Sequence, residues 1–283
     1  MKHYIALTKP RITWLILMST GMGYFFGLTG AVNLWALFHT ILGTGLIASG
    51  TAALNQWYER EADARMRRTD QRPLPTGQMD ARKAFAFGVL LSVLGFVELG
   101  LGVNWLSAGL GLFTLMTYLC LYTPLKQISP VSTTIGAVPG AMPPLIGFAA
   151  ASGTLTAEAW ILYAILFVWQ FPHFYAIAWM YREDYERAGI KMLPVVEPDG
   201  ESTVRQMLFF SALLIPISLV PRYLDMTGNI YVVGTLIAGI AFVASCVRMS
   251  SDRTLLKARS VLLVSVVYLP VLYGLLLLDR PRF

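Results

Sequence analysis

Long uninterrupted runs of apolar residues dominate this chain, and most polar residues lie between them. A helix needs roughly 20 residues to cross the hydrocarbon core of a bilayer. Here the apolar residues fill whole segments instead of one stripe per helix, which is typical of spanning helices. Nine segments are long enough, and we expect them to cross the membrane at residues 12–30, 34–54, 84–103, 105–122, 134–152, 157–180, 206–222, 228–248 and 259–278.

The composition and the charge distribution both favour an all-α membrane bundle. Hydrophobic residues make up 56% of the chain and charged residues 13%, about half the usual charged share of soluble domains. If the N-terminus is cytoplasmic, all 22 basic residues except Arg222, Arg280 and Arg282 fall on the cytoplasmic side. This asymmetry follows the positive-inside rule and predicts a cytoplasmic N-terminus. The net charge of +6 is then a signal of topology and requires no nucleic-acid partner.

Most of the acidic residues gather in two segments expected on the cytoplasmic side, residues 55–83 and 181–205. Both segments are also strongly basic. Acids mixed with bases at the mouth of a helical bundle suggest a metal bound together with an anion. A solvated, salt-bridged loop is the alternative, and charge counts alone favour it.

Asn55, Glu59 and Asp63 are spaced four residues apart and continue the second span without an intervening Gly or Pro. Steps of four keep side chains on one face of a helix, about 6 Å apart along its axis. Two carboxylates and an amide oxygen in line suit Mg²⁺, which leaves its other positions to water and substrate phosphates. Arg68 and Arg72 follow, and guanidinium groups bind diphosphate oxygens well. A helix of alternating charge would also place acids four apart, so the spacing alone leaves both interpretations open.

The second polar segment follows an aromatic run from Trp169 to Trp179, which contains His173. Asp184 is the best candidate for a metal ligand in this segment, with Glu183 next, and Lys191 could contact a phosphate. Aromatic residues at this depth are by default interfacial anchors or core residues. Rings beside a diphosphate site would also stabilise a developing allylic cation, and the sequence leaves both roles open.

The spacing of Asn55, Glu59 and Asp63 resembles the first aspartate-rich motif of the UbiA superfamily of intramembrane prenyltransferases. The segment DARMRRTDQRPLPTG, from Asp63 to Gly77, resembles the signature of the protohaem IX farnesyltransferases within it. The resemblance covers roughly residues 7–200 and includes, in the expected order, LTKPR, YTPLK, IGAVPGAMPPLIG, FPHFYAIA and DYERAGIKMLPV.

Two positions depart from the superfamily pattern. Glu59 stands where the first aspartate is usual, which keeps the charge but lengthens the side chain by one methylene. Tyr181 and Tyr185 stand where the quinone-making members carry the acids of a second motif. The haem O synthases share this second departure, so it supports that family, but it leaves the ligands of a second metal open apart from Asp184.

The resemblance implies a single UbiA-like domain of nine transmembrane helices over residues 1–283, in a bacterial inner membrane. It implies transfer of a farnesyl group from farnesyl diphosphate to a vinyl group of protohaem IX (haem B), with addition of water, giving haem O and diphosphate. A haem A synthase or a terminal oxidase would use the product. One Mg²⁺ would be held by Asn55, Glu59 and Asp63 and a second near Asp184. The diphosphate would be bound by Arg68, Arg72, Lys126 and Lys191.

His173 has two interpretations under this resemblance. It would bind the haem iron or a propionate, because histidine is a common haem ligand and an ionisable residue within a span is often functional. Alternatively it would cap the sixth span through hydrogen bonds.

Three rival functions fit parts of the pattern. A related enzyme that prenylates an aromatic acceptor such as 4-hydroxybenzoate would share the fold and the metals, but should carry a fuller second motif. A secondary transporter would also have spans interrupted by Gly and Pro, but its site should lie near the midplane of the membrane. A haem chaperone that only binds its ligand would not need Asn55, Glu59 and Asp63 in line.

Overall fold

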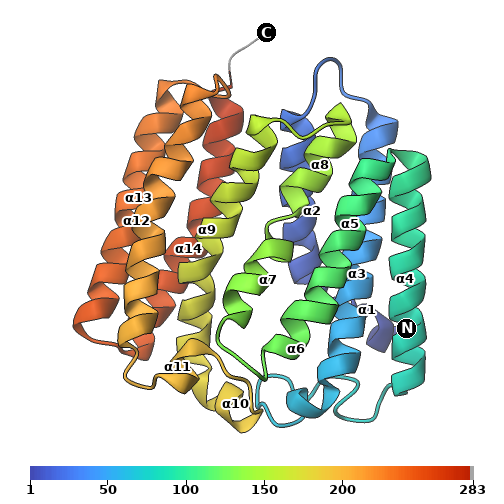
Figure 1. The fold of residues 1–283 in the computed structure, drawn as a ribbon, viewed down its shortest axis with the longest axis vertical. Helices are drawn as coiled ribbons and strands as arrows, with labels where there is room; N and C mark the ends of the chain where they lie inside the picture. Colours follow the sequence, from blue (N-terminus) through green and yellow to red (C-terminus); the bar gives the residue numbers. More distant parts are fainter. Residues whose placement is uncertain (281–283) are drawn as a thin grey trace.

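The computed structural model describes residues 1–280, and that part of the chain is a bundle of helices without a β-strand (Figure 1). The helices are α1 (Lys2–Leu7), α2 (Pro10–Phe26), α3 (Leu34–Asp63), α4 (Ala81–Gly102), α5 (Trp105–Met116), the π-helix η1 (Thr117–Tyr122), α6 (Thr123–Leu125), α7 (Ser132–Gly140), α8 (Pro143–Ser152), α9 (Ala157–Met180), α10 (Arg182–Arg187), α11 (Leu193–Val196), α12 (Glu201–Tyr223), α13 (Asn229–Ser251) and α14 (Leu255–Leu278).

Eight helical segments within residues 1–280 are long and apolar enough to cross a membrane, and they match the second to the ninth predicted span. The predicted first span corresponds to α2, a helix of 17 residues that packs against α3 and α8. The all-α membrane fold is confirmed, whereas the count of nine spans and the cytoplasmic N-terminus stay predictions. In Figure 1, α1 lies at one end of the bundle and α14 ends at the other, as an odd number of crossings requires.

Three of the predicted spans are not single regular α-helices with the predicted bounds. Residues 134–152 are split: α7 ends at Gly140 and α8 begins at Pro143, where two successive prolines lack the N–H groups that would continue the helix. Residues 105–122 change from α5 into the π-helix η1. The span predicted at residues 206–222 begins earlier, at Glu201, so the first turn of α12 occupies part of the expected loop 181–205.

Glycines allow α3 to pack closely against α4. A Cβ atom on Gly50 would collide with Ser92 Oγ and lie 2.7 Å from the Gly88 carbonyl oxygen. A Cβ atom on Gly95 would lie 2.7 Å from the carbonyl oxygen of Gly43. The two glycines of each helix are seven residues apart, which is about two helical turns. This contact fixes α3, the helix whose last turns carry the predicted metal ligands.

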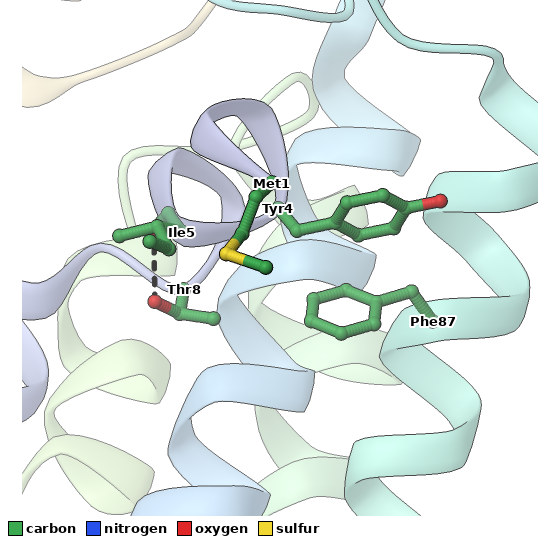
Figure 2. Close-up of a pocket in the computed structure, with 5 residues that line it drawn as sticks. All are labelled: Met1, Tyr4, Ile5, Thr8 and Phe87. Atoms are coloured by element: carbon green, nitrogen blue, oxygen red, sulfur yellow. Dashed lines mark hydrogen bonds between the residues drawn. The ribbon is translucent and has the colours of Figure 1, made fainter.

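The short helix α1 lies beside the first turns of α4 (Figure 2). The Tyr4 ring packs edge-on against Phe87, with ring centroids 4.9 Å apart. Met1, Ile5 and Thr8 complete the lining of a hollow of about 460 Å³. Its lining side chains include no carboxylate, lysine, arginine or histidine, so it lacks the groups that a metal or a diphosphate would need.

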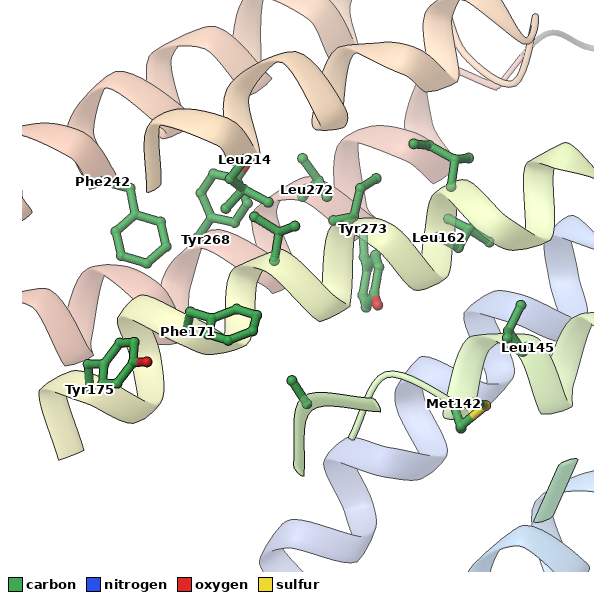
Figure 3. Packing of buried hydrophobic residues seen from close by; sticks show 14 of the residues in the cluster. Met142, Leu145, Leu162, Phe171, Tyr175, Leu214, Phe242, Tyr268, Leu272 and Tyr273 are labelled. Atoms are coloured by element: carbon green, nitrogen blue, oxygen red, sulfur yellow. The ribbon is translucent and has the colours of Figure 1, made fainter. Parts of the chain in front are cut away.

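An apolar core joins α9 to α12, α13 and α14 (Figure 3). Phe171 stacks on Phe210 with ring centroids 3.8 Å apart, and Phe242 packs against Tyr268 at 5.6 Å. The outward-facing side chains are also large and apolar, as Leu101 illustrates with 75% of its surface exposed. Such a surface fits a lipid environment, and the chain is a multi-pass membrane protein.

Candidate active site

The last turns of α3 carry a buried row of oxygen ligands, which we call the ladder: Asn55, Glu59 and Asp63. The helix continues unbroken from the span to Asp63, as the spacing predicted. The exposed fractions of the three residues are 1%, 8% and 1%. Buried carboxylates require charged or hydrogen-bonding partners. The ladder therefore differs from a solvated, salt-bridged loop, in which the acids would lie at the surface.

Each ladder residue contacts one cationic side chain from a different part of the chain. Lys126 Nζ donates to Glu59 Oε1 at 2.7 Å, and Arg72 donates to Asp63 Oδ2 at 2.6 Å. Lys9 Nζ donates to Asn55 Oδ1 at 3.2 Å. The structure thus brings the predicted residues Arg72 and Lys126 to the ladder.

Lys9 was not among the predicted site residues. It lies in the segment LTKPR, which was noted for its resemblance but contains no feature that predicts contact with α3. Its backbone is left-handed, with φ 47°, immediately before α2. A non-glycine residue in that region costs on the order of 1–3 kcal/mol and persists only where its surroundings fix it. Burial of the ammonium, together with repulsion from Arg72, lowers the pKa of Lys9 to about 7.

Electrostatics keep the Glu59 carboxyl ionised. Burial raises the pKa of Glu59, but the Lys126 ammonium beside it, together with Lys9 and the hydrogen bond from Asn55, outweighs burial and holds that pKa below its usual value. Lys126 Nζ also lies 4.4 Å from the ring centroid of Tyr122 and 6.0 Å from that of Tyr118. Both tyrosines belong to the π-helix η1, and π-helical turns occur frequently at functional sites.

The hydroxyl of Thr123 orients the amide of Asn55. Thr123 Oγ1 donates to the Tyr118 carbonyl oxygen at 2.8 Å and accepts from Asn55 Nδ2 at 3.4 Å. With its nitrogen turned toward Thr123, Asn55 presents Oδ1 to Lys9 on the other side. The amide oxygen therefore joins the carboxylates as a possible metal ligand.

The second polar segment lies next to the loop that follows the ladder. The buried Asp184 side chain accepts a hydrogen bond from the Arg68 backbone N–H through Oδ2, at 3.3 Å, and its Oδ1 pairs with Arg187. The Arg68 guanidinium lies over the rings of Tyr181 and Tyr185, 4.8 and 5.5 Å from their centroids. Two of the predicted residues, Arg68 and Asp184, are thereby joined.

Within residues 1–280, the contacts of Lys191 and His173 do not join their side chains to the ladder. The Lys191 side chain is exposed, and its backbone N–H donates to the Lys126 carbonyl oxygen at 2.7 Å, which ties this segment to the end of α6. His173 lies on α9, where its ring stacks on Trp169 and its Nδ1 is 2.8 Å from Ser265 Oγ of α14. Among the described residues these contacts connect His173 to α14 and not to the ladder.

The ladder has the donor chemistry that Mg²⁺ requires. Within residues 1–280, no three His, Cys, Asp or Glu side chains lie close enough to hold a metal by themselves. The ladder instead supplies two carboxylates and one amide oxygen, all hard ligands. Mg²⁺ commonly takes one or two carboxylates and completes its shell with water and phosphate oxygens. The residues therefore fit an ion that binds together with a diphosphate.

Comparison with known proteins identifies the family. The model of the UbiA prenyltransferase family matches residues 16–271. The chain belongs to this family. As a UbiA prenyltransferase it is an enzyme, and the secondary-transporter alternative is set aside.

Relatives of this UbiA prenyltransferase cover nearly its whole length. A protein of Solibacter usitatus named protoheme IX farnesyltransferase is 64% identical, over 99% of each chain. A protein of the same name from Koribacter versatilis is 48% identical, over 99% of this chain and 94% of the relative. These relatives confirm the predicted resemblance to protohaem IX farnesyltransferases.

Solved structures confirm the UbiA fold. A structure of digeranylgeranylglyceryl phosphate synthase superposes with a TM-score of 0.82 at 16% identity, over 98% of this chain and 97% of the other. A UbiA homologue from Archaeoglobus fulgidus bound to GPP and Mg²⁺ superposes with a TM-score of 0.68 at 17% identity, over 97% and 99%.

Proposed function

We propose that this UbiA prenyltransferase transfers a farnesyl group from farnesyl diphosphate to a vinyl group of protohaem IX, with addition of water, giving haem O and diphosphate. The observation that carries the proposal is the full-length match, at 64% identity, to a protein named protoheme IX farnesyltransferase. We further propose that the membrane is a bacterial inner membrane with the ladder on the cytoplasmic side. Use of the product by a haem A synthase or a terminal oxidase stays a prediction.

The ladder would hold Mg²⁺ through the side-chain oxygens of Asn55, Glu59 and Asp63. A homologue of the same fold has been solved with GPP and Mg²⁺, which supports a metal together with a prenyl diphosphate. When bound, the ion supplies positive charge to the diphosphate. Lys126 and Arg72 lie against the ladder carboxylates and balance their charge before the ion binds.

The cations beside the ladder would then serve the leaving group. The farnesyl carbon–oxygen bond breaks with its electron pair passing to the diphosphate, and Lys9, Arg72 and Lys126 stabilise the charge that develops there. Positioned charges of this kind usually make the largest contribution to catalysis. The vinyl electron pair of the haem forms the new carbon–carbon bond, and water captures the resulting cation with loss of a proton.

The contact of His173 with Ser265 fits its structural interpretation, and a haem role would use the other ring nitrogen. The Ser265 hydroxyl donates to the Leu262 carbonyl oxygen at 2.6 Å, so its oxygen accepts the Nδ1–H of a neutral His173. The Nε2 atom then carries a lone pair. A lone pair can bind the haem iron, whereas a carboxylate would require a donor. We therefore propose iron ligation through Nε2.

The proposal is tested by mass analysis of haem extracted after membranes containing the protein are incubated with protohaem, farnesyl diphosphate and Mg²⁺. A new haem heavier by one farnesyl group plus water, absent with a chelator and with Asp63→Asn, is the expected result. Unchanged protohaem from folded protein that prenylates 4-hydroxybenzoate would overturn it in favour of the aromatic-acceptor enzyme.

A further inference from the structure

We propose that Arg68 takes the place of a second metal ion in this enzyme, and that Asp184 is the positioning residue that holds Arg68. The inference rests on the proposed function, because it concerns how the diphosphate of the prenyl substrate is bound. It differs from the sequence prediction that Asp184 is a metal ligand.

Both carboxylate oxygens of Asp184 are engaged by the protein. Oδ2 accepts the backbone N–H of Arg68, and Oδ1 pairs with Arg187, one turn further along α10. A metal at Oδ2 would compete with a main-chain N–H, which cannot swing aside as a side chain can, and a metal at Oδ1 would have to displace the Arg187 guanidinium. The partners of the ladder carboxylates are the long side chains of Lys126 and Arg72, which can move from the acid to an incoming phosphate.

Positions 181 and 185, on either side of Asp184 in the sequence, carry no acid. Tyr181 and Tyr185 are four residues apart, the same spacing as in the ladder, but they present phenol rings. A neutral phenol is a poor ligand for Mg²⁺, which prefers carboxylate and phosphate oxygens. Asp184 is the buried acid of α10, and both of its oxygens already have protein partners.

The two rings hold a cation instead. The Arg68 guanidinium lies 4.8 Å from the centroid of Tyr181 and 5.5 Å from that of Tyr185, and it donates to the Tyr185 hydroxyl at 3.2 Å. Stacking on aromatic faces restricts a guanidinium before the ligand arrives. Its remaining N–H groups can bind phosphate oxygens in a forked geometry.

The hydrogen bond from the Arg68 backbone N–H to Asp184 fixes the position of the Arg68 backbone. The loop after α3 is anchored at Arg68 to α10, so its side chain leaves the loop from a defined point beside both rings. The diphosphate would therefore be bound by one Mg²⁺ at the ladder and by the Arg68 guanidinium.

The first test counts ions. Mn²⁺, which accepts the same oxygen ligands, is titrated into the purified full-length protein with farnesyl S-thiolodiphosphate, and unbound Mn²⁺ is measured by electron paramagnetic resonance. We expect one analogue-dependent ion in the wild type, the same in Asp184→Asn, and none in Asp63→Asn. Two ions in the wild type, or loss of an ion in Asp184→Asn, would overturn the inference alone. If the folded wild-type protein does not bind the analogue, both the inference and the proposed function are overturned.

The second test measures coupling. Arg68→Ala should weaken analogue binding by about tenfold or more, as expected for loss of a charged hydrogen-bonding partner, with partial recovery in Arg68→Lys. Asp184→Ala should weaken it to a similar extent, and the double variant should lose no more than Arg68→Ala alone, because Asp184 acts through Arg68. Arg65→Ala, an exposed side chain in the same loop, is the matched control. Additive losses, or unchanged binding in Arg68→Ala, would overturn the inference.

Discussion

Lys126 and Glu59 form a buried ion pair of 2.7 Å between the end of α6 and the last turns of α3, with 13% and 10% of their side chains exposed. Removing one partner of such a pair leaves the other as an uncompensated buried charge. The state of the Glu59 carboxyl therefore depends on Lys126.

Substitution of Lys126 by Met should move the acid limb of the activity profile to higher pH. Without the ammonium, only Lys9 and the hydrogen bond from Asn55 oppose the effect of burial, so the pKa of Glu59 rises. Because metal binding requires the ionised carboxylate, activity is then lost at a higher pH as the pH falls. The profile of kcat/KM against pH measures this. Lys126→Arg, which retains the charge, should keep the acid limb near that of the wild type, and an unchanged limb in Lys126→Met would contradict the expectation.

Substitution of Asp63 by Asn should reduce turnover by at least about a hundredfold, the order of loss expected when a positioned charge is removed from an active site. The side chain keeps its size, so the protein should still fold and remain in the membrane. Glu61→Gln is the matched control, since Glu61 is on the same helix but 77% of its side chain is exposed. Haem product formation is measured in both, and equal losses would argue against a special role for Asp63.

Binding of a prenyl diphosphate should be accompanied by proton uptake at Lys9. The pKa of this lysine is about 7 in the free protein, so at about pH 8 it is mostly neutral. An anionic ligand favours the charged form and raises that pKa, so a proton is taken up on binding. Titration calorimetry in buffers of different ionisation enthalpy measures the uptake. It should be absent in Lys9→Gln and smaller at about pH 6, where Lys9 is already charged; equal uptake in Lys9→Gln would assign the proton to another group.

Substitution of Gly50 by Ala should destabilise the protein. The added methyl group collides with Ser92 Oγ and approaches the Gly88 carbonyl, and overpacking of this kind typically costs about 1–3 kcal/mol. Thermal unfolding in detergent should show a lower midpoint. The control is Gly109→Ala on α5, where the new Cβ has nothing within 4 Å and helix propensity favours Ala. Similar midpoints for both variants would mean that α3 and α4 adjust at little cost.

The sequence predicted the parts of the structure that depend on local periodicity. Apolar runs located the spans, and the four-residue spacing placed Asn55, Glu59 and Asp63 on one continuous helix. The same reasoning could not identify Lys9, because its approach to Asn55 joins residues 46 positions apart through a left-handed turn. Such contacts are decided by tertiary packing and leave no periodic signal.

Irregular backbone within the spans was also missed. The π-helical turn at Thr117–Tyr122 and the break between Gly140 and Pro143 lie in runs that are continuous in hydropathy. Hydrophobicity reports whether a residue enters the membrane, and it does not report which carbonyl its N–H contacts. The proline pair at the start of α8 was the one available indication of the break.

Ribosomal synthesis completes α3 well before α6, and 67 residues separate Glu59 from the lysine that neutralises it. A nascent chain that ends before Lys126 lacks the ammonium that forms the ion pair with Glu59. That acid must stay hydrated at the membrane surface while α4 and α5 are inserted. The last turns of α3 can therefore reach their final packing only after α6 has emerged, so the ladder is completed later than the helix that carries it.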